Sequence, residues 1–301
     1  MINAEQLKMQ GAVQADLSEA VGNTALERTA RPGLKFLTNG VVNQLNLKPI
    51  LTQLMLVVGS FALLLLAWAL IATLSPDLPS PSATLPELWK LISNPFYDNG
   101  PTDQGIGIQV MMSLQRVFSG WIVGSLFAIP IGLFMGSSKT IMGLLNPIIQ
   151  ILRPVSPLAW YPIGLAVYKN AGNAVIFAII ITSLWPTLLN TMIGAASVPN
   201  DYRNVSRVFN FSRWKYLTKV LIPYTLPHTL TGLRLSMGIA WMVIVAGEML
   251  AGSTGIGFFV WDSWNALSLE RVICAILIIG IIGLTLDRTL DWFTARVRYD
   301  H

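Results

Sequence analysis

The sequence predicts an all-α integral membrane protein with about six transmembrane helices. Its mean hydropathy is +0.58 and only 12% of its residues are charged, whereas about a quarter of the residues in a soluble domain carry a charge. The stretches 51–74, 117–138 and 170–200 contain no charged residue. Each of them reaches the roughly 18 to 20 residues that a helix needs to cross a bilayer. The chain is therefore expected to pass through the membrane several times.

We expect spanning helices near residues 51–74, 108–135, 142–168, 173–197, 226–250 and 271–294. This divides the chain into a polar tail (1–45), a first transmembrane segment (46–74), a loop (75–107), a core of five helices (108–295) and a short tail (296–301). Four residues interrupt the third span, namely Arg153, Pro154, Pro157 and Pro162. Because a proline inside a helix removes a backbone hydrogen bond and kinks the chain, we expect a break there.

The second span carries a stripe of small residues spaced four apart: Gly120, Gly124, Ala128, Gly132 and Gly136. Small residues allow two helix backbones to approach closely inside a membrane. We expect this face to pack against another helix of the same chain. The alternative is that it faces a second subunit or a transport pathway.

The distribution of lysine and arginine predicts the orientation. With the N-terminus inside, fourteen of the 20 Lys and Arg residues fall in the inner segments, three (Lys90, Lys169 and Arg271) in the outer loops, and three within spans. Cytoplasmic loops carry an excess of such residues. Both termini and the 200–223 segment are therefore expected on the cytoplasmic side, and the 75–107 loop is expected to be periplasmic.

A basic segment separates two apolar runs and reads RNVSRVFNFSRWKYLTKVLIP over residues 203–223. Five of its residues are cationic and none is acidic: Arg203, Arg207, Arg213, Lys215 and Lys219. The spacing of Val205, Val208 and Phe209 predicts a helix with an apolar face, which Asn200 or Asp201 is suited to cap.

A turn and a second helix are expected to follow. Asn210 suits a left-handed turn because asparagine tolerates that conformation. Ser212 is suited to cap the second helix, in which Trp214, Leu217 and Leu221 share a face and which we expect to end at Pro223. The segment would then form an elbow of two helices. Two uses remain open, namely an interfacial element among anionic lipid headgroups or a docking site for a cytoplasmic partner. A nucleic-acid surface is disfavoured.

The elbow resembles the signature E-A-A-x3-G-x9-I-x-L-P of ABC-importer permeases. The same spacing runs through Asn204-Val205-Ser206, Asn210 and Val220-Leu221-Ile222-Pro223. Here Asn204 replaces the signature glutamate, so any contact made by that carboxylate is in doubt, while Asn210 in place of glycine keeps the turn chemistry. The run LIPYTLPHTLTGLRLSMGIAWMVIVAGEMLAGSTGIGFFVWDSWNAL (221–267) is similar to the nitrate/sulfonate/bicarbonate branch, especially its cyanobacterial members. The similarity covers roughly residues 105–295.

The resemblance implies a type I ABC-importer permease fold in a bacterial (cyanobacterial) inner membrane, with the elbow seated in a groove of an ATPase. The coupling residues would be Asn204, Val205, Ser206, Arg207, Phe209, Asn210, Trp214 and Pro223. The chain has no G-x-x-x-x-G-K-[ST] phosphate loop, so ATP and Mg are expected on the partner ATPase and no cofactor or metal on this non-catalytic chain. The implied partners are a second permease copy (a homodimer), two ATP-binding subunits, an external binding protein and the bilayer, with no nucleic acid.

Charged residues inside the spans are the candidates for a transport pathway, because a charge in a membrane is costly and tends to be functional. They are Arg116, Arg153, Arg234 and Glu248, with Trp241 added as an aromatic candidate. Arg153 is the foremost of these because it lies in the broken third span. The alternative for each arginine is a structural role near an interface. Glu248 is expected to brace a neighbouring arginine or to gate the pathway, and Asp287 and Asp291 to form a solvated helix end.

The expected cargo is a small inorganic anion, first nitrate with nitrite, then bicarbonate, then a sulfonate. A secondary anion transporter is the main rival, but such proteins usually have an internal repeat and a midplane carboxylate, and neither is visible here. Phe258, Phe259, Trp261 and Trp264 follow the glycine-rich GSTGIG run. They are expected to form an aromatic belt at the headgroups or, alternatively, a lid or a seat for the external binding protein.

Overall fold

The computed structural model describes residues 47–75, 77–100 and 103–297. In these residues all regular structure is helical, apart from an isolated bridge between Asp98 and Gln104. The chain divides into two units, Met1–Ala67 and Trp68–His301, and each is considered by itself. The polar tail expected over 1–45 and most of the tail expected over 296–301 lie outside the described residues.

The first long helix, α3 (Leu47–Leu74), has 28 residues and is uncharged from Leu51 onward. Its apolar side chains occur on every side of the helix, which is typical of a membrane span. At 1.5 Å per residue a helix of this length extends about 42 Å, more than the roughly 30 Å of a hydrocarbon core. The helix expected over 46–74 is therefore present and is long enough to cross a membrane.

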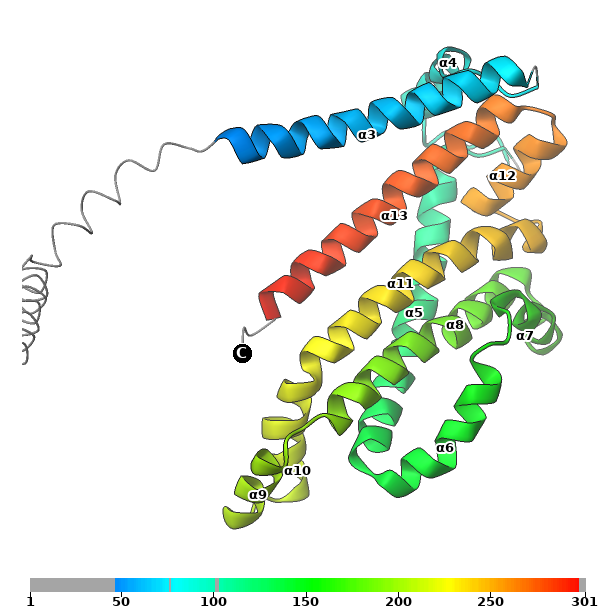
Figure 1. Cartoon of the computed structure of the whole chain (residues 1–301). Helices are drawn as coiled ribbons and strands as arrows, with labels where there is room; N and C mark the ends of the chain where they lie inside the picture. Colours follow the sequence, from blue (N-terminus) through cyan, green and yellow to red (C-terminus); the bar gives the residue numbers. More distant parts are fainter. Residues whose placement is uncertain (1–46, 76, 101–102, 298–301) are drawn as a thin grey trace, which may run out of the picture. The chain divides into compact units, whose positions relative to one another are not determined.

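Three long helices form the centre of the second unit. Both α5 (Ile106–Ser137) and α11 (Ile222–Ala251) pack along α8 (Ala171–Ala196), as Figure 1 shows. The core between them is nearly inaccessible to solvent and includes Val117, Val175, Ile179, Met237 and Ile244. These helices fix the positions of the functional side chains considered below.

The small-residue stripe of α5 lies directly against α8. A Cβ atom added to Gly124 would lie 2.3 Å from Ser183 Oγ, and one added to Gly136 would lie 2.4 Å from the Met192 carbonyl oxygen. Ala128, between them on the stripe, is completely buried. The stripe thus lets two helices of the same chain approach closely, which confirms the expected intrachain packing.

The third span is broken, as its prolines predict. It consists of α6 (Lys139–Leu152), a 3-10 turn η1 (Pro157–Trp160) and α7 (Tyr161–Tyr168), and its two arms meet at 95°. Arg153 caps the C-terminal end of α6, directly before Pro154. Among the described residues, five helices are long and apolar enough to cross a membrane, and this bent pair makes six if it counts as one span.

The second helix of the elbow does not end at Pro223. α10 (Arg213–Tyr216) continues through a π-helical segment η2 (Leu217–Leu221) into α11, so that Arg213–Ala251 forms one run of 39 residues. Pro223 lies in the first turn after the wider π segment, where its missing N–H and its ring are tolerated. The π turn also shifts the register. Leu217 and Leu221 pack into one buried cluster, in agreement with the expected face, whereas Trp214 is 73% exposed and does not join them.

The loop expected over 75–107 contains a further helix, α4 (Pro81–Ser93). Ser80 caps it by accepting a hydrogen bond from the Ala83 amide at 3.3 Å, and Pro81 fits the first turn. The helix packs on α13 (Leu269–Val297), and its Leu91 joins a buried cluster with Cys274 and Ala275. Charges and two prolines concealed this helix in the sequence.

An ion-pair cluster ties α4 to α13. Glu87 accepts hydrogen bonds from Lys90 and from Arg271, each at 3.0 Å. The hydrogen bond from Lys90, with a further contribution from Arg271, lowers the pKa of Glu87 below its ordinary value of 4.5, although partial burial opposes the shift.

Because the pKa of Glu87 is lower in the folded state, its stabilising effect is present above about pH 4.5 and is lost as the pH falls further. We expect Glu87→Gln to speed hydrogen exchange of the α4 amides modestly at pH 7. The loss of local stability should be less than about 1 kcal/mol, because Lys90 and Arg271 are 75% and 45% exposed. The difference from the unaltered protein should shrink as the pH falls below 4.5. An effect of equal size at both extremes would contradict this assignment.

Candidate functional site

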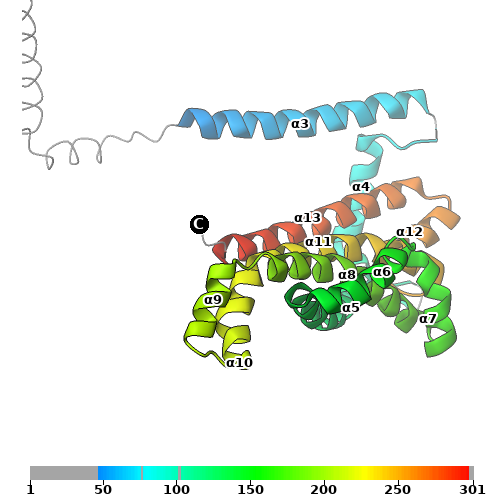
Figure 2. The same cartoon turned by 60° about the horizontal axis from the view of Figure 1, so that its bottom comes forward.

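The elbow projects from one end of α8 and α11 (Figure 2). It consists of α9 (Asn200–Val208), a turn at Asn210 with φ of 47°, and α10. The Phe211 amide donates to the Ser206 carbonyl at 2.9 Å, and Ser212 accepts from the Lys215 amide at 3.2 Å. The left-handed turn and the Ser212 cap are confirmed. The cap expected from Asn200 or Asp201 is wrong, because the helix begins at Asn200 after Pro199 and has no side-chain cap.

The surface of the elbow exposes large apolar side chains. Val205 is 52% exposed, Phe209 69% and Trp214 73%. Val208, about one helical turn from Val205 on α9, is also exposed. Clustered apolar exposure on a polar segment is typical of a surface that contacts another molecule. Ser206, by contrast, is buried and donates to the Arg203 carbonyl at 2.7 Å. It therefore stabilises α9 and is not part of the exposed apolar surface.

A basic pocket of about 360 Å³ opens beside the turn of the elbow. It is lined by Ser137, Arg203, Ser206, Arg207, Phe211, Arg213 and Tyr216. None of its three guanidinium groups makes a hydrogen bond or ion pair with another described residue, and the Nε of Arg203 is buried without a partner. Ser137 belongs to the last turn of α5, so the pocket joins the elbow to the helix bundle.

A second cavity, of about 410 Å³, lies at the break in the third span. Its lining comes from that break, from α8 and from α11, and consists of Arg153, Val155, Pro157, Trp160, Ile181, Thr182, Trp185, Pro186, Leu189, Asn190 and Ile239. The lining contains no acidic residue. The indole nitrogen of Trp160 is buried and has no hydrogen-bond partner among the described residues.

The three arginines that were candidates for a pathway differ in their partners. Arg116 pairs with Glu248, and Arg234 pairs with Asp287 at 2.7 Å and also with Asp291. Arg153 forms no ion pair with any described residue and faces the cavity at the break. The aspartates of α13, expected to form a solvated helix end, are about half exposed, and both also bind Arg234 of α11.

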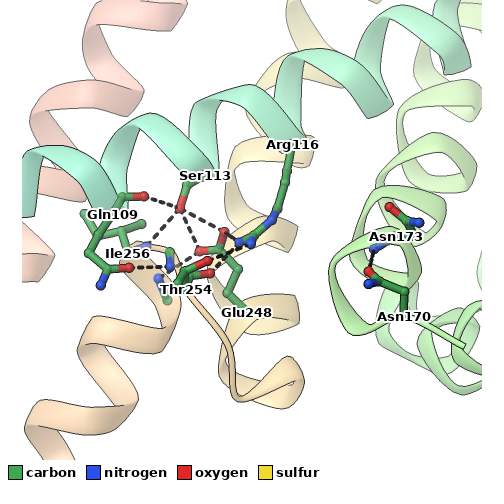
Figure 3. A network of polar contacts seen from close by, with 10 residues as sticks. Gln109, Ser113, Arg116, Asn170, Asn173, Glu248, Thr254 and Ile256 are labelled. Carbon is green, nitrogen blue, oxygen red and sulfur yellow. Dashed lines mark hydrogen bonds and ion pairs between the residues drawn. The ribbon is translucent and has the colours of Figure 1, made fainter. Parts of the chain in front are cut away.

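The buried carboxylate of Glu248 is the centre of a polar network between α5 and α11 (Figure 3). It accepts hydrogen bonds from Arg116 at 2.7 Å, from Ser113 at 2.7 and 2.9 Å, and from the Gly257 amide at 3.0 Å. Its side chain is 0% exposed and that of Arg116 is 16% exposed. The expectation that Glu248 braces an arginine is confirmed.

The same network fixes the loop between α11 and α12 (Ile256–Asn265). Arg116 donates to the carbonyl and hydroxyl oxygens of Thr254, and Gln109 accepts from the Gly255 amide. Ser113 accepts from the Ile256 amide at 2.8 Å. The start of α12 is thus held by side chains of α5. Among the aromatic residues that follow, Phe259 is buried, whereas Trp261 and Trp264 are about half exposed.

Trp241, the remaining candidate for the pathway, does not line the cavity at the break in the third span. Trp241 is 5% exposed and donates from its indole nitrogen to the Ile279 carbonyl at 3.1 Å, so it faces α13. The sequence reasoning missed Trp160, Trp185 and Asn190 in the cavity at the break. Trp160 was detectable in principle, since it stands in the same proline-interrupted stretch as Arg153. Trp185 and Asn190 belong to an ordinary apolar helix and carry no local signal.

Comparison with known proteins agrees with this architecture. Residues 128–299 match the family described as binding-protein-dependent transport system inner membrane component. The nitrate import permease protein of Synechocystis sp. is 44% identical over 239 residues, which cover 79% of this chain and 87% of that protein. The bicarbonate transport system permease protein of Synechococcus elongatus is 41% identical over 204 residues, or 67% of this chain and 73% of that protein.

A solved structure shows the same fold. A chain of the MetNI methionine ABC transporter, in an inward-facing conformation, superposes with a TM-score of 0.58 at 13% identity and covers 64% of this chain and 96% of its own length. At that identity the likeness concerns the fold alone, and the fold is the expected type I importer arrangement. Together with the family match over more than half of the sequence, these findings place the chain among the permease components of ABC importers, the membrane-embedded, non-catalytic subunits of binding-protein-dependent transport systems.

Proposed function

We propose that this chain is the permease subunit of an ATP-driven importer of a small inorganic anion, with nitrate, and nitrite beside it, as the first cargo. The observation that carries the proposal is the cavity at the break in the third span. Arg153 faces it without an acidic partner, whereas Arg116 and Arg234 are both paired with acids. Relatives named for nitrate import support the choice of cargo.

The chemistry of the cavity suits an anion. A guanidinium group offers planar, paired donors and is weakly hydrated, so it offsets part of the desolvation cost of a bound oxyanion. Trp160 lines the same cavity, and its indole N–H is buried without a hydrogen-bond partner among the described residues. Since no carboxylate lines the wall, no formal negative charge there repels an anion. We therefore assign the cavity to the translocation pathway.

In this proposal the termini and the elbow lie on the cytoplasmic side and two permease copies form the pathway. An importer permease works with ATPase subunits and a substrate-binding protein. We assign the ATPase contact to the exposed residues of the elbow, which include Val205, Phe209 and Trp214. ATP-driven closure of the ATPase would move the elbow, and the helices attached to it would then open and close the pathway in alternation.

Arg153→Glu tests the proposal. Reversing the charge should abolish uptake of isotopically labelled nitrate in a strain that lacks the native permease, while the amount of assembled transporter stays unchanged. Arg153→Lys keeps the charge but loses the planar donors, so it should retain partial uptake with a raised KM. Undiminished nitrate uptake by the Arg153→Glu protein would remove the cavity from the pathway.

Bicarbonate is the second candidate cargo, because a bicarbonate permease is 41% identical to this chain. Labelled nitrate and labelled bicarbonate supplied to the same strain separate the two cargoes. Reconstitution in liposomes with and without internal ATP separates the importer from a secondary transporter. Uptake that follows a proton gradient and ignores ATP would overturn the assignment to an importer.

A further inference from the structure

We infer that the basic pocket of the elbow receives an acidic side chain of the ATPase subunit. The inference rests on the proposed function, in which the elbow contacts that subunit. It goes further by giving the contact a chemistry and a polarity, in which the permease supplies the cations and the ATPase supplies the carboxylate.

The charge in the pocket is uncompensated. Arg203, Arg207 and Arg213 face a common space of about 360 Å³, and no acidic residue lines it. The sole acid in residues 200–223 is Asp201, which is exposed and does not line the pocket. Three guanidinium groups gathered in this way repel one another unless an anion lies between them.

One of these groups has an unmet need for an acceptor. The Nε of Arg203 is buried and has no hydrogen-bond partner among the described residues. A buried donor without an acceptor costs free energy, and buried polar groups in proteins are almost always hydrogen-bonded. The Nε itself is closed off from solvent, but Arg203 lines the pocket, and a carboxylate bound there would match its guanidinium in both charge and geometry.

The surroundings of the pocket favour a protein as the source of the carboxylate. Val208, Phe209 and Trp214 beside the turn are strongly exposed. Exposed aromatic residues next to charged groups are typical of protein contact surfaces, where apolar side chains exclude water from a charge pair. A volume of about 360 Å³ accommodates one or two acidic side chains.

The sequence of the elbow agrees with this polarity. At the position where the permease signature has glutamate, this chain has Asn204, which is exposed and uncharged. The permease therefore offers no carboxylate there, while its cations surround the turn at Asn210. A charge pair between elbow and ATPase is still possible if the acid comes from the ATPase.

The location gives the contact a mechanical role. Ser137, at the end of α5, lines the pocket together with residues of α9 and α10. A carboxylate bound there would contact the elbow and approach the bundle helix at the same time. Motion of the ATPase would then reach α5 directly as well as through α11.

The test uses the whole transporter purified from membranes through a tag on the permease. Permease variants Arg207→Glu and Arg213→Glu should retain about tenfold less ATPase subunit than the unaltered permease at low salt. Lys219→Glu is the matched control, since it makes the same charge change in the π-helical segment η2 next to the elbow but does not line the pocket. It should retain the ATPase subunit as the unaltered permease does.

A charge-swap rescue identifies the partner. Acidic surface residues of the ATPase subunit are changed singly to lysine and combined with the Arg213→Glu permease. Recovery of the complex by one such pair, with loss of ATPase binding when that lysine meets the unaltered permease, supports the inference. No rescue by any acidic position overturns it, even if the Arg153 variants affect nitrate uptake as proposed.

Lipid and free anions are separated in the same preparations. Native mass spectrometry counts anionic lipid bound to the unaltered and Arg207→Glu permeases, and ATPase retention is measured with and without inorganic phosphate. Loss of lipid from the variant with full retention of the ATPase overturns the inference in favour of a headgroup site. If retention of the ATPase subunit depends on added phosphate and on no acidic residue of that subunit, the inference is overturned in favour of a free anion.

Discussion

Replacing Glu248 with alanine is expected to destabilise the protein by about 3–5 kcal/mol, because the change leaves Arg116 without its acid in a nearly dry site. The carboxylate is 0% exposed and the arginine side chain 16% exposed. The change also leaves Ser113 and the Gly257 amide without their acceptor. Unfolding titrations of the purified protein in mixed detergent micelles measure the loss.

Two controls separate the ion pair from a general effect of truncation. The double variant Arg116→Met with Glu248→Met should recover part of the loss, since an apolar pair replaces an uncompensated charge. Asp291→Ala removes a 45% exposed acid while Arg234 keeps Asp287, and it should cost less than about 1 kcal/mol. If the double variant lost as much as the two single changes together, the pair would not be coupled.

Gly255→Ala is expected to have a comparable effect for a different reason. Gly255 has φ of 129°, a conformation that residues with a side chain rarely adopt, and an added Cβ would lie 2.1 Å from the carboxyl carbon of Glu248. Backbone strain of this kind costs about 1–3 kcal/mol, and the clash adds to it. We expect the variant to lose the Glu248 network and to expose the α11–α12 loop to protease.

Gly252→Asn is the matched control for Gly255→Ala. Gly252 is also left-handed, with φ of 60°, but nothing lies within 4 Å of a Cβ at that position. Asparagine tolerates this region of the backbone map, so the variant should remain close to the unaltered protein in stability. If both variants became equally sensitive to protease, the effect of Gly255→Ala would be a general effect of substitution in this loop. It would then not be due to loss of the Glu248 network.

The sequence predicted those features that local patterns determine. Uncharged runs located the long helices, since membrane helices need a fixed number of apolar residues. The prolines around Arg153 located the break, and Asn210 located the left-handed turn, because both depend on the residue itself. The stripe from Gly120 to Gly136 predicted a close helix contact for the same reason.

Features that depend on partners distant in the sequence could not be predicted. Asp287 and Asp291 follow Arg234 by 53 and 57 residues in the sequence. Their pairing with it depends on how α11 and α13 pack. The continuation of the helix through Pro223 depends on a π turn that has no sequence signature. The unpartnered donors of Trp160 and Arg203 are properties of the surrounding space. Only the three-dimensional structure shows that these nitrogens lack acceptors among the described residues.

The run from Arg213 to Ala251 is long enough to convert a small tilt at one end into a large displacement at the other. At 1.5 Å per residue its 39 residues extend about 58 Å, so tilting it by about 5° displaces one tip by about 5 Å relative to the other. Glu248 stands near the far tip, and its hydrogen bonds cannot follow a displacement of that size without breaking or carrying α5 with them. If an ATPase moves the elbow as proposed, the far end of the run can follow only by rigid rotation of α11 together with α5 or by breaking of the hydrogen bonds of Glu248.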